Sequence, residues 1–254
     1  MYLIHIFGDL ITMIKALGTL GVGAIKPCHS CHIEAICDIQ VKWKTYYLPL
    51  TIPGHAENCL WEILNNLQTH NDYLQMYCRL DSAAMEAERK RIQKETGIKH
   101  CSIFALLPYF DMGLAIPGGF MHTVYINLFK ALIKLWCGEF KGLGAGTGNY
   151  IIPAPIWERI GIETRNTVKS IPASFVQSIL NIDTDFGNFT AEDLAFWMTW
   201  LSPYLLADRL PLPYYKHLLE LVKIVKTCTG FGIMKEEHAK LSVDIFKWRL
   251  EYER

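Results

Sequence analysis

Three cysteines and two histidines lie within twelve residues near the start of the chain, in KPCHSCHIEAIC (26–37). Cys28 and Cys31 have the C-x-x-C spacing, at which two thiolates can bind one tetrahedral Zn²⁺ ion. Three neighbours could complete or compete for such a site: His29, His32 and Cys37. The same spacing occurs in redox dithiols and in thiols without a role, so the residues leave three interpretations open. A redox motif of the thioredoxin type opens a helix within a β-α-β pattern, which is absent here.

Asp9 is another residue whose position is compatible with a chemical role. It follows an apolar stretch that predicts a short buried strand over Tyr2–Phe7, and it precedes LITMIKALG (10–18), which has helical spacing and ends in glycine. An aspartate at the end of a strand can bind Mg²⁺ when a second carboxylate lies nearby. An aspartate before a helix is also a common N-cap. Both roles are compatible with the sequence.

His122 lies just after the start of the apolar stretch 120–138, where a single histidine is more often a packed core residue than a ligand. The glycine-rich stretch 141–150 lacks the Gly-Lys-Ser/Thr of a phosphate-binding loop and is expected to be a turn. Aromatic residues of the later predicted helices are expected to pack in the core: Phe196, Trp197, Trp200, Tyr204, Tyr214 and Tyr215.

The elements that position these residues are mainly helical. Residues 19–55 are rich in glycine, proline and cysteine and predict a loop with one strand at 45–50, whereas the pattern from about residue 56 is helical. The clearest helices are predicted over 81–97, 120–138, 190–210, 214–230 and 235–254.

Capping signals set the ends of two of these helices. For 81–97 the sequence offers Asp81 or Ser82 as the N-cap and Gly97 as the terminator. For 190–210, Thr190 and Asp193 are in capping positions at the start of the helix, and Pro203 is expected to kink or break it.

The composition limits the function classes. Of the 254 residues, 51% are apolar and 20% charged, as in folded globular proteins, and the formal net charge is zero. A zero net charge argues against an overall basic footprint for nucleic acid, although Lys and Arg gather in ERKRIQKETGIK (88–99). No uncharged apolar run of about 18 residues predicts a membrane span. No secretory signal is evident, so the cysteines are expected to be reduced thiols.

Several stretches of the chain resemble, in order, the middle portion of the transposases of CACTA (En/Spm-type) DNA transposons. They are HIFGDLITMIKALG, KPCHSCHIEAI, YYLPLTIPGH, LQTHNDY, TGIKHCSIFALLPYF, IPGGFMHTVYINLFKALIKLWCGEF, SIPASFV and FWMTWLSPYLL. The resemblance extends from about residue 3 to the C-terminus. It implies a ribonuclease-H-like core with a D-D-E acid triad that holds two Mg²⁺ ions, interrupted by a large helical insertion. The expected fold is therefore mainly α, with a small α/β remnant of that core in 1–55 and a helical insertion domain in 56–254.

The resemblance also implies roles for individual residues. Asp9 matches the second acid of the triad, which follows a strand in a Gly-Asp-Leu-Pro context, with Ile11 where proline is usual. Cys28 and Cys31 match a C-x-x-C pair that follows this acid. An acid-x-x-His element comes later, and here His122 matches although Gly119 replaces the acid. A structural zinc site is thus expected from Cys28, Cys31 and His122, with His32 or His29 in the fourth position.

The implied function is DNA strand cleavage and transfer in the intact transposase. The first and last acids of the triad are expected to lie before Met1 and beyond the stretch 251–254, so the chain is expected to be a segment that is inactive alone. Its implied partners are transposon DNA and other transposase subunits, in the nucleus and without a membrane. The alternative is a non-catalytic helical DNA-binding or protein-interaction module derived from a transposase.

Overall fold

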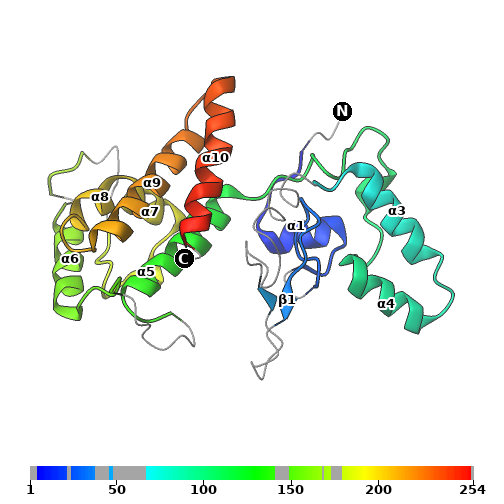
Figure 1. Ribbon diagram of the computed structural model, residues 1–254, viewed down its shortest axis with the longest axis horizontal. Helices are drawn as coiled ribbons and strands as arrows, with labels where there is room; N and C mark the ends of the chain where they lie inside the picture. The colour runs from blue at the N-terminus through cyan, green and yellow to red at the C-terminus, as the bar shows by residue number, and fades with distance from the viewer. Residues whose placement is uncertain are drawn as a thin grey trace. The chain divides into compact units, whose positions relative to one another are not determined.

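Amphipathic helices make up most of the described chain, which confirms the mainly α prediction (Figure 1). The computed structural model describes residues 5–21, 24–37, 46–47, 67–140, 149–167, 169–172 and 179–252, and only the backbone of 36–37 and 46–47. The chain forms two compact units, residues 1–119 and 120–254. The predicted domain boundary after residue 55 lies outside the described residues. No described helix is both long and apolar enough to span a membrane.

The described residues of the first unit form three α-helices, a short 3₁₀ turn and a minimal strand pair. The elements are α1 (Leu10–Leu17), β1 (Ile36–Cys37), β2 (Tyr46–Tyr47), α3 (His70–Asp81), α4 (Glu86–Thr96) and η2 (Ile103–Leu106). Strands β1 and β2 pair antiparallel, and β2 falls within the stretch predicted as a strand. The core consists of Met13, Leu17, Tyr73, Tyr77, Leu80, Ile92, Ile98, Phe110, Met112, Ala115 and Ile116.

Helix α1 begins and ends where the sequence predicts. Asp9 caps its N-terminus, and Gly18 ends it with φ +65°, a left-handed conformation that glycine adopts without steric cost. A side chain at Gly18 would also collide with the backbone carbonyl of His100. Glycine is therefore required at this position for two independent reasons.

The strand predicted over Tyr2–Phe7 is not present in its described part, residues 5–7. Ile6 donates one backbone hydrogen bond to the Ala115 carbonyl, at 2.8 Å, and the Phe7 side chain is 74% exposed. A single bond to a loop makes no ladder, so the prediction of a buried strand is wrong for these residues.

Helix α4 begins later than the sequence predicts. Asp81 is the last residue of α3, Ser82 is its C-cap, and α4 starts after Met85, which makes no side-chain capping bond. The reason is that the apolar spacing of α3 continues to the fully buried Leu80 and extends that helix to Asp81. The predicted terminator is confirmed, because Gly97 ends α4 with φ +74°.

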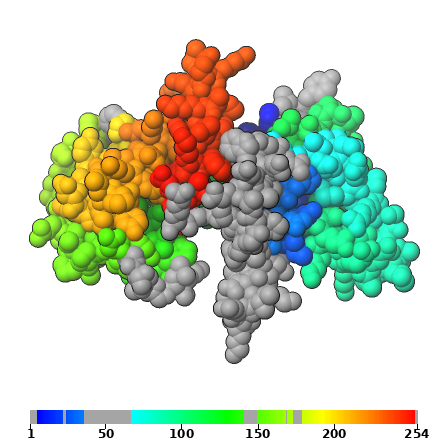
Figure 2. Space-filling model, viewed as in Figure 1, coloured from blue at the N-terminus to red at the C-terminus, as the bar shows by residue number. Residues whose placement is uncertain are grey.

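The second unit is a layered helical bundle. Its elements are the π-helix η3 (Met121–Phe129), α5 (Lys130–Trp136), α6 (Ala154–Thr167), η4 (Phe186–Asn188), α7 (Ala191–Phe196), the π-helical η5 (Trp197–Leu201), α8 (Ser202–Leu205), α9 (Leu212–Cys228) and α10 (Lys235–Tyr252). A capping box between Thr190 and Asp193 starts α7, as predicted. Helix α10, red in Figure 2, lies on the surface and buries only Trp248.

Trp197 is the centre of this bundle and is fully buried. Its ring packs against those of Phe129 and Trp157, with centroids 5.8 and 6.3 Å away. Its indole N–H donates to the Thr164 hydroxyl at 2.9 Å, so the one polar atom of the ring is satisfied. The core prediction is confirmed for Trp197.

The same prediction is wrong for Trp200 and Tyr204, which are 52% and 81% exposed. Trp200 lies under the ammonium group of Lys226, 4.4 Å from the ring centroid. Pro203 does not end the helical run, which passes from η5 into α8. The π-helical turn before Pro203 changes the hydrogen-bond spacing there, which accommodates a residue without an N–H.

Candidate metal-binding loop

The C-x-x-C pair lies in a loop that is closed by backbone hydrogen bonds. The Ala35 N–H donates to the Ile25 carbonyl at 2.7 Å, and the Gln68 N–H donates to the Ser30 carbonyl at 3.0 Å. Cys31 also forms an isolated antiparallel bridge with Leu67. The loop is thus attached to the segment that leads into α3.

Two side chains, one just before α3 and one in its first turn, hold the loop through hydrogen bonds to its backbone carbonyls. The Gln68 amide, 7% exposed, donates to the carbonyls of both Cys28 and Cys31 at 2.9 Å. The Tyr73 hydroxyl donates to the His29 carbonyl at 2.6 Å, and burial raises the pKa of Tyr73 well above its usual range. Tyr73 therefore remains a neutral donor, and the backbone of the C-x-x-C turn has little freedom to move.

The Cys28 sulfur is arranged to carry negative charge. A hydrogen bond with the Cys31 side chain is the largest influence and, against the opposing effect of burial, lowers the pKa of Cys28 from 9.0 to about 5. Backbone N–H groups add to this effect, and that of Ser30 lies 3.4 Å from the sulfur. Cys28 is therefore a thiolate at neutral pH, which is the form of cysteine that binds metals.

The two histidines of the loop differ in their surroundings. The Nε2 atom of His29 is buried and has no hydrogen-bond partner within the described chain. The Nε2 atom of His32 lies 3.5 Å from a carboxylate oxygen of Asp72. Asp72 belongs to the capping box of α3, and the Thr69 N–H lowers the pKa of its carboxyl, so this partner is an anion. Of the two, His29 has the nitrogen that lacks a partner.

The other residues singled out by the sequence lie elsewhere. Asp9 accepts the Thr12 N–H through its carboxylate, at 2.7 Å, as the N-cap of α1. His122 is half-buried on the π-helix η3 of the second unit. Among the described residues, no three His, Cys, Asp or Glu side chains lie close enough together to hold a metal ion. What the fold brings together is the thiol pair of Cys28 and Cys31.

We compared the chain with protein-family models, with curated proteins and with solved structures. None of them matches. The function of this loop therefore has to be inferred from its own geometry and from the sequence.

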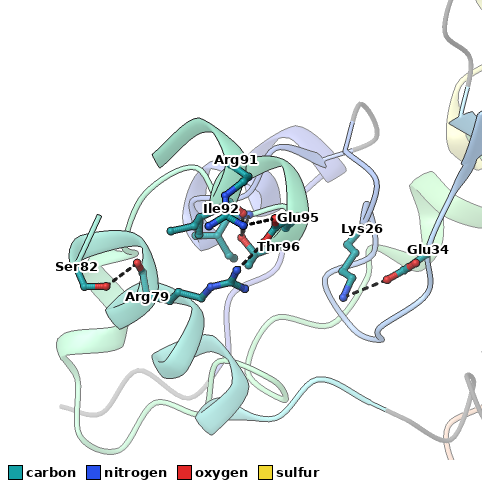
Figure 3. A network of polar contacts seen from close by, with 9 residues as sticks. Lys26, Glu34, Arg79, Ser82, Arg91, Ile92, Glu95 and Thr96 are labelled. Atoms are coloured by element: carbon teal, nitrogen blue, oxygen red, sulfur yellow. Dashed lines mark hydrogen bonds and ion pairs between the residues drawn. The ribbon is translucent and has the colours of Figure 1, made fainter. Parts of the chain in front are cut away.

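A cavity of about 530 Å³ opens between the loop and helices α3 and α4. Three pairs of a basic and an acidic side chain line it: Lys26 with Glu34 at 3.3 Å, His32 with Asp72, and Arg79 with Glu95 at 2.6 Å. Figure 3 shows the first and the last of these pairs. Because each basic side chain of these pairs has an acidic partner, the cavity shows no preference for one sign of charge.

The sequence gives no indication of Gln68 and Tyr73 as part of the site. Both lie more than 35 residues beyond the cysteines, and their contacts are tertiary. The one local signal is the capping pair of Thr69 and Asp72, which marks the start of a helix directly after Gln68. That signal predicts the helix and says nothing of the loop that it supports.

Proposed function

We propose that this chain is a segment of a CACTA-type transposase in which Cys28 and Cys31 hold a structural zinc ion. One observation carries the zinc assignment: the two thiols are hydrogen-bonded to each other in a loop whose carbonyls Gln68 clamps. By holding these two carbonyls, Gln68 fixes the backbone that carries both thiols. The transposase assignment rests on the ordered resemblance of the sequence.

The donor chemistry suits zinc. A closed tetrahedral site takes four ligands, and thiolate sulfur is a preferred one. Cys28 and Cys31 supply two ligands, and His32 or His29 of the same loop is the candidate for a third. His29 is the better loop histidine, because its buried Nε2 atom has no partner whereas His32 already pairs with Asp72.

In the proposed parent enzyme, Asp9 contributes to a ribonuclease-H-like core within 1–55, and residues 56–254 form the helical insertion. Magnesium ions bound by the acid triad would there supply the activation of water or of a DNA 3′ hydroxyl. Transposon DNA and other transposase subunits are the proposed partners, and the nucleus is the proposed location. The position of Asp9 directly before α1 is compatible with this role.

Zinc content tests the proposal. The purified chain is loaded with zinc, dialysed and measured by elemental analysis beside the variants Cys28→Ser and Cys78→Ser. Cys78 is an exposed thiol on α3 and serves as the matched control. We expect about one zinc per chain in the wild type and in Cys78→Ser, and none in Cys28→Ser. No zinc in the wild type, or full zinc in Cys28→Ser, would contradict the assignment.

A non-catalytic helical module, binding DNA or protein, is the second candidate. The observation that favours it is the N-cap bond of Asp9, which accounts for an aspartate at this position without catalysis. Both candidates predict that this chain alone does not nick DNA in the presence of Mg²⁺. Nicking by the wild type that Asp9→Asn abolishes would show catalysis by Asp9 and exclude the second candidate, because asparagine is an equally good N-cap.

A further inference from the structure

The strongest local concentration of positive charge in the first unit lies on α4 and the turn after it. Residues 89–99 contain five Lys and Arg residues and one acid, in a chain whose formal net charge is zero. Helix α4 is also the most polar helix of this unit, and Ile92 is its only buried residue. Burial in the core therefore does not explain the residue types at most positions of α4.

The cations gather on the outer face of α4. At 3.6 residues per turn, Lys90 and Lys94 lie on the side opposite Ile92 and Arg91 lies on the flank of the helix, about 100° from Ile92; all three are exposed. Lys99 is also exposed in the turn that follows. Lys90 and Lys94 are four residues apart, a spacing at which like charges weaken a helix. A bound polyanion would offset this repulsion, because each lysine would then lie beside a negative charge.

The acids of α4 compensate only part of this charge, and Glu86 pairs with Lys90 at 3.8 Å. Glu95 is shared by Arg79 and Arg91, at 2.6 and 3.0 Å, and the Arg79 guanidinium holds the pKa of Glu95 below its usual value (Figure 3). The other two acids, Glu86 and Glu88, lie in the first turn, where the helix dipole favours them. No described carboxylate pairs with Lys94 or Lys99. The C-terminal half of α4 is thus a net basic surface.

From this surface we propose that Lys90, Arg91, Lys94 and Lys99 bind the phosphate backbone of duplex DNA. Two features favour a nucleic acid over an acidic protein. Protein-binding surfaces centre on buried aromatic or apolar anchors, and the outer face of α4 presents none between Glu86 and Thr96. Helix α4 also follows α3 after the short turn 82–85, a spacing found in helix-turn-helix motifs, whose second helix enters the major groove.

The choice of DNA as the polyanion rests on the proposed function. The test measures binding of a fluorescently labelled duplex by anisotropy at several salt concentrations, for the wild type and for Lys90→Gln/Lys94→Gln. Glutamine keeps the helix propensity and removes only the charge. The control is Lys240→Gln/Lys247→Gln, which removes two exposed charges from α10.

Losing two phosphate contacts should reduce the slope of log K against log salt by about 1.8, and weaken binding at least about tenfold at 0.1 M salt. The control should bind like the wild type. Equal binding by the α4 variant, no binding by the wild type, or equally tight binding of polyglutamate would each overturn the proposal. Circular dichroism of each variant verifies that it is folded.

Zinc content measured on the same preparations separates this inference from the function on which it rests. If DNA binding fails while the wild type holds zinc in a Cys28-dependent manner, only the assignment of α4 is lost. If zinc is absent while the α4 variant loses DNA binding, the metal assignment fails and the DNA surface remains.

Discussion

Replacing Gln68 by methionine tests whether the C-x-x-C loop is held in place by the start of α3. The change removes the amide that donates to the carbonyls of Cys28 and Cys31, both at 2.9 Å, and keeps a side chain of similar length. Each hydrogen bond of this kind contributes about 0.5–1.5 kcal/mol, so losing both should cost about 2 kcal/mol. At about 1.4 kcal/mol per factor of ten, this corresponds to a roughly 30-fold change in the opening equilibrium of the loop.

Hydrogen exchange followed by mass spectrometry is the suitable assay, because it reports local opening. The amide of Ala35, bonded to the Ile25 carbonyl, and that of Gln68, bonded to the Ser30 carbonyl, are protected only while the loop is closed. Both should exchange about 30-fold faster in Gln68→Met. Amides of α9, in the other unit, should be unaffected and serve as the internal reference.

Gln75→Met is the matched control, since Gln75 lies exposed on α3 and makes no described hydrogen bond. It should change the exchange of the loop by less than about twofold, as surface substitutions of this kind cost little. Unchanged exchange in Gln68→Met would show that the clamp does not hold the loop, and would refute the reasoning. An equal increase of the loop's exchange rate in both variants would refute it as well, because the introduced methionine and not the loss of the Gln68 amide would then be the cause.

Two further predictions follow from buried groups. Thr164→Val removes the acceptor of the buried Trp197 indole N–H and should destabilise the second unit by about 1–3 kcal/mol, measured by urea unfolding with tryptophan fluorescence; a loss below about 0.5 kcal/mol would contradict it. The pKa of Cys28, lowered to about 5, predicts that its alkylation by iodoacetamide rises with pH through an inflection near 5 in the folded chain and near 9 in urea. Because the pKa is depressed on folding, the associated stability is complete above pH 9 and is lost as pH falls toward 5.

Helix ends were predictable from the sequence where a local side chain creates them. The capping box of Thr190 with Asp193 and the left-handed glycines Gly18 and Gly97 act over a few residues, so their effect can be recognised in a short window. The start of α4 was not predictable in this way, because Met85 makes no capping bond. There the preceding helix continues through tertiary burial, which short-range capping signals do not describe.

Of the candidate site, only the thiol pair was predictable from the sequence. The spacing of Cys28 and Cys31 indicates a thiol pair, and the fold brings the two side chains into a hydrogen bond. The support from Gln68 and Tyr73 comes from about 40 residues away and depends on how α3 packs. A buried amide that bonds to two carbonyls has no sequence signature, so this part of the site required the structure.

The nature of the metal ligands tests the central claim most directly. X-ray absorption at the zinc edge of the zinc-loaded chain gives the number and type of bound atoms. Two sulfur ligands at about 2.3 Å, reduced to one in Cys31→Ser, are the result expected if Cys28 and Cys31 bind the ion together. A first shell of only nitrogen and oxygen at about 2.0–2.2 Å would show that any bound zinc lies elsewhere, and would contradict the account.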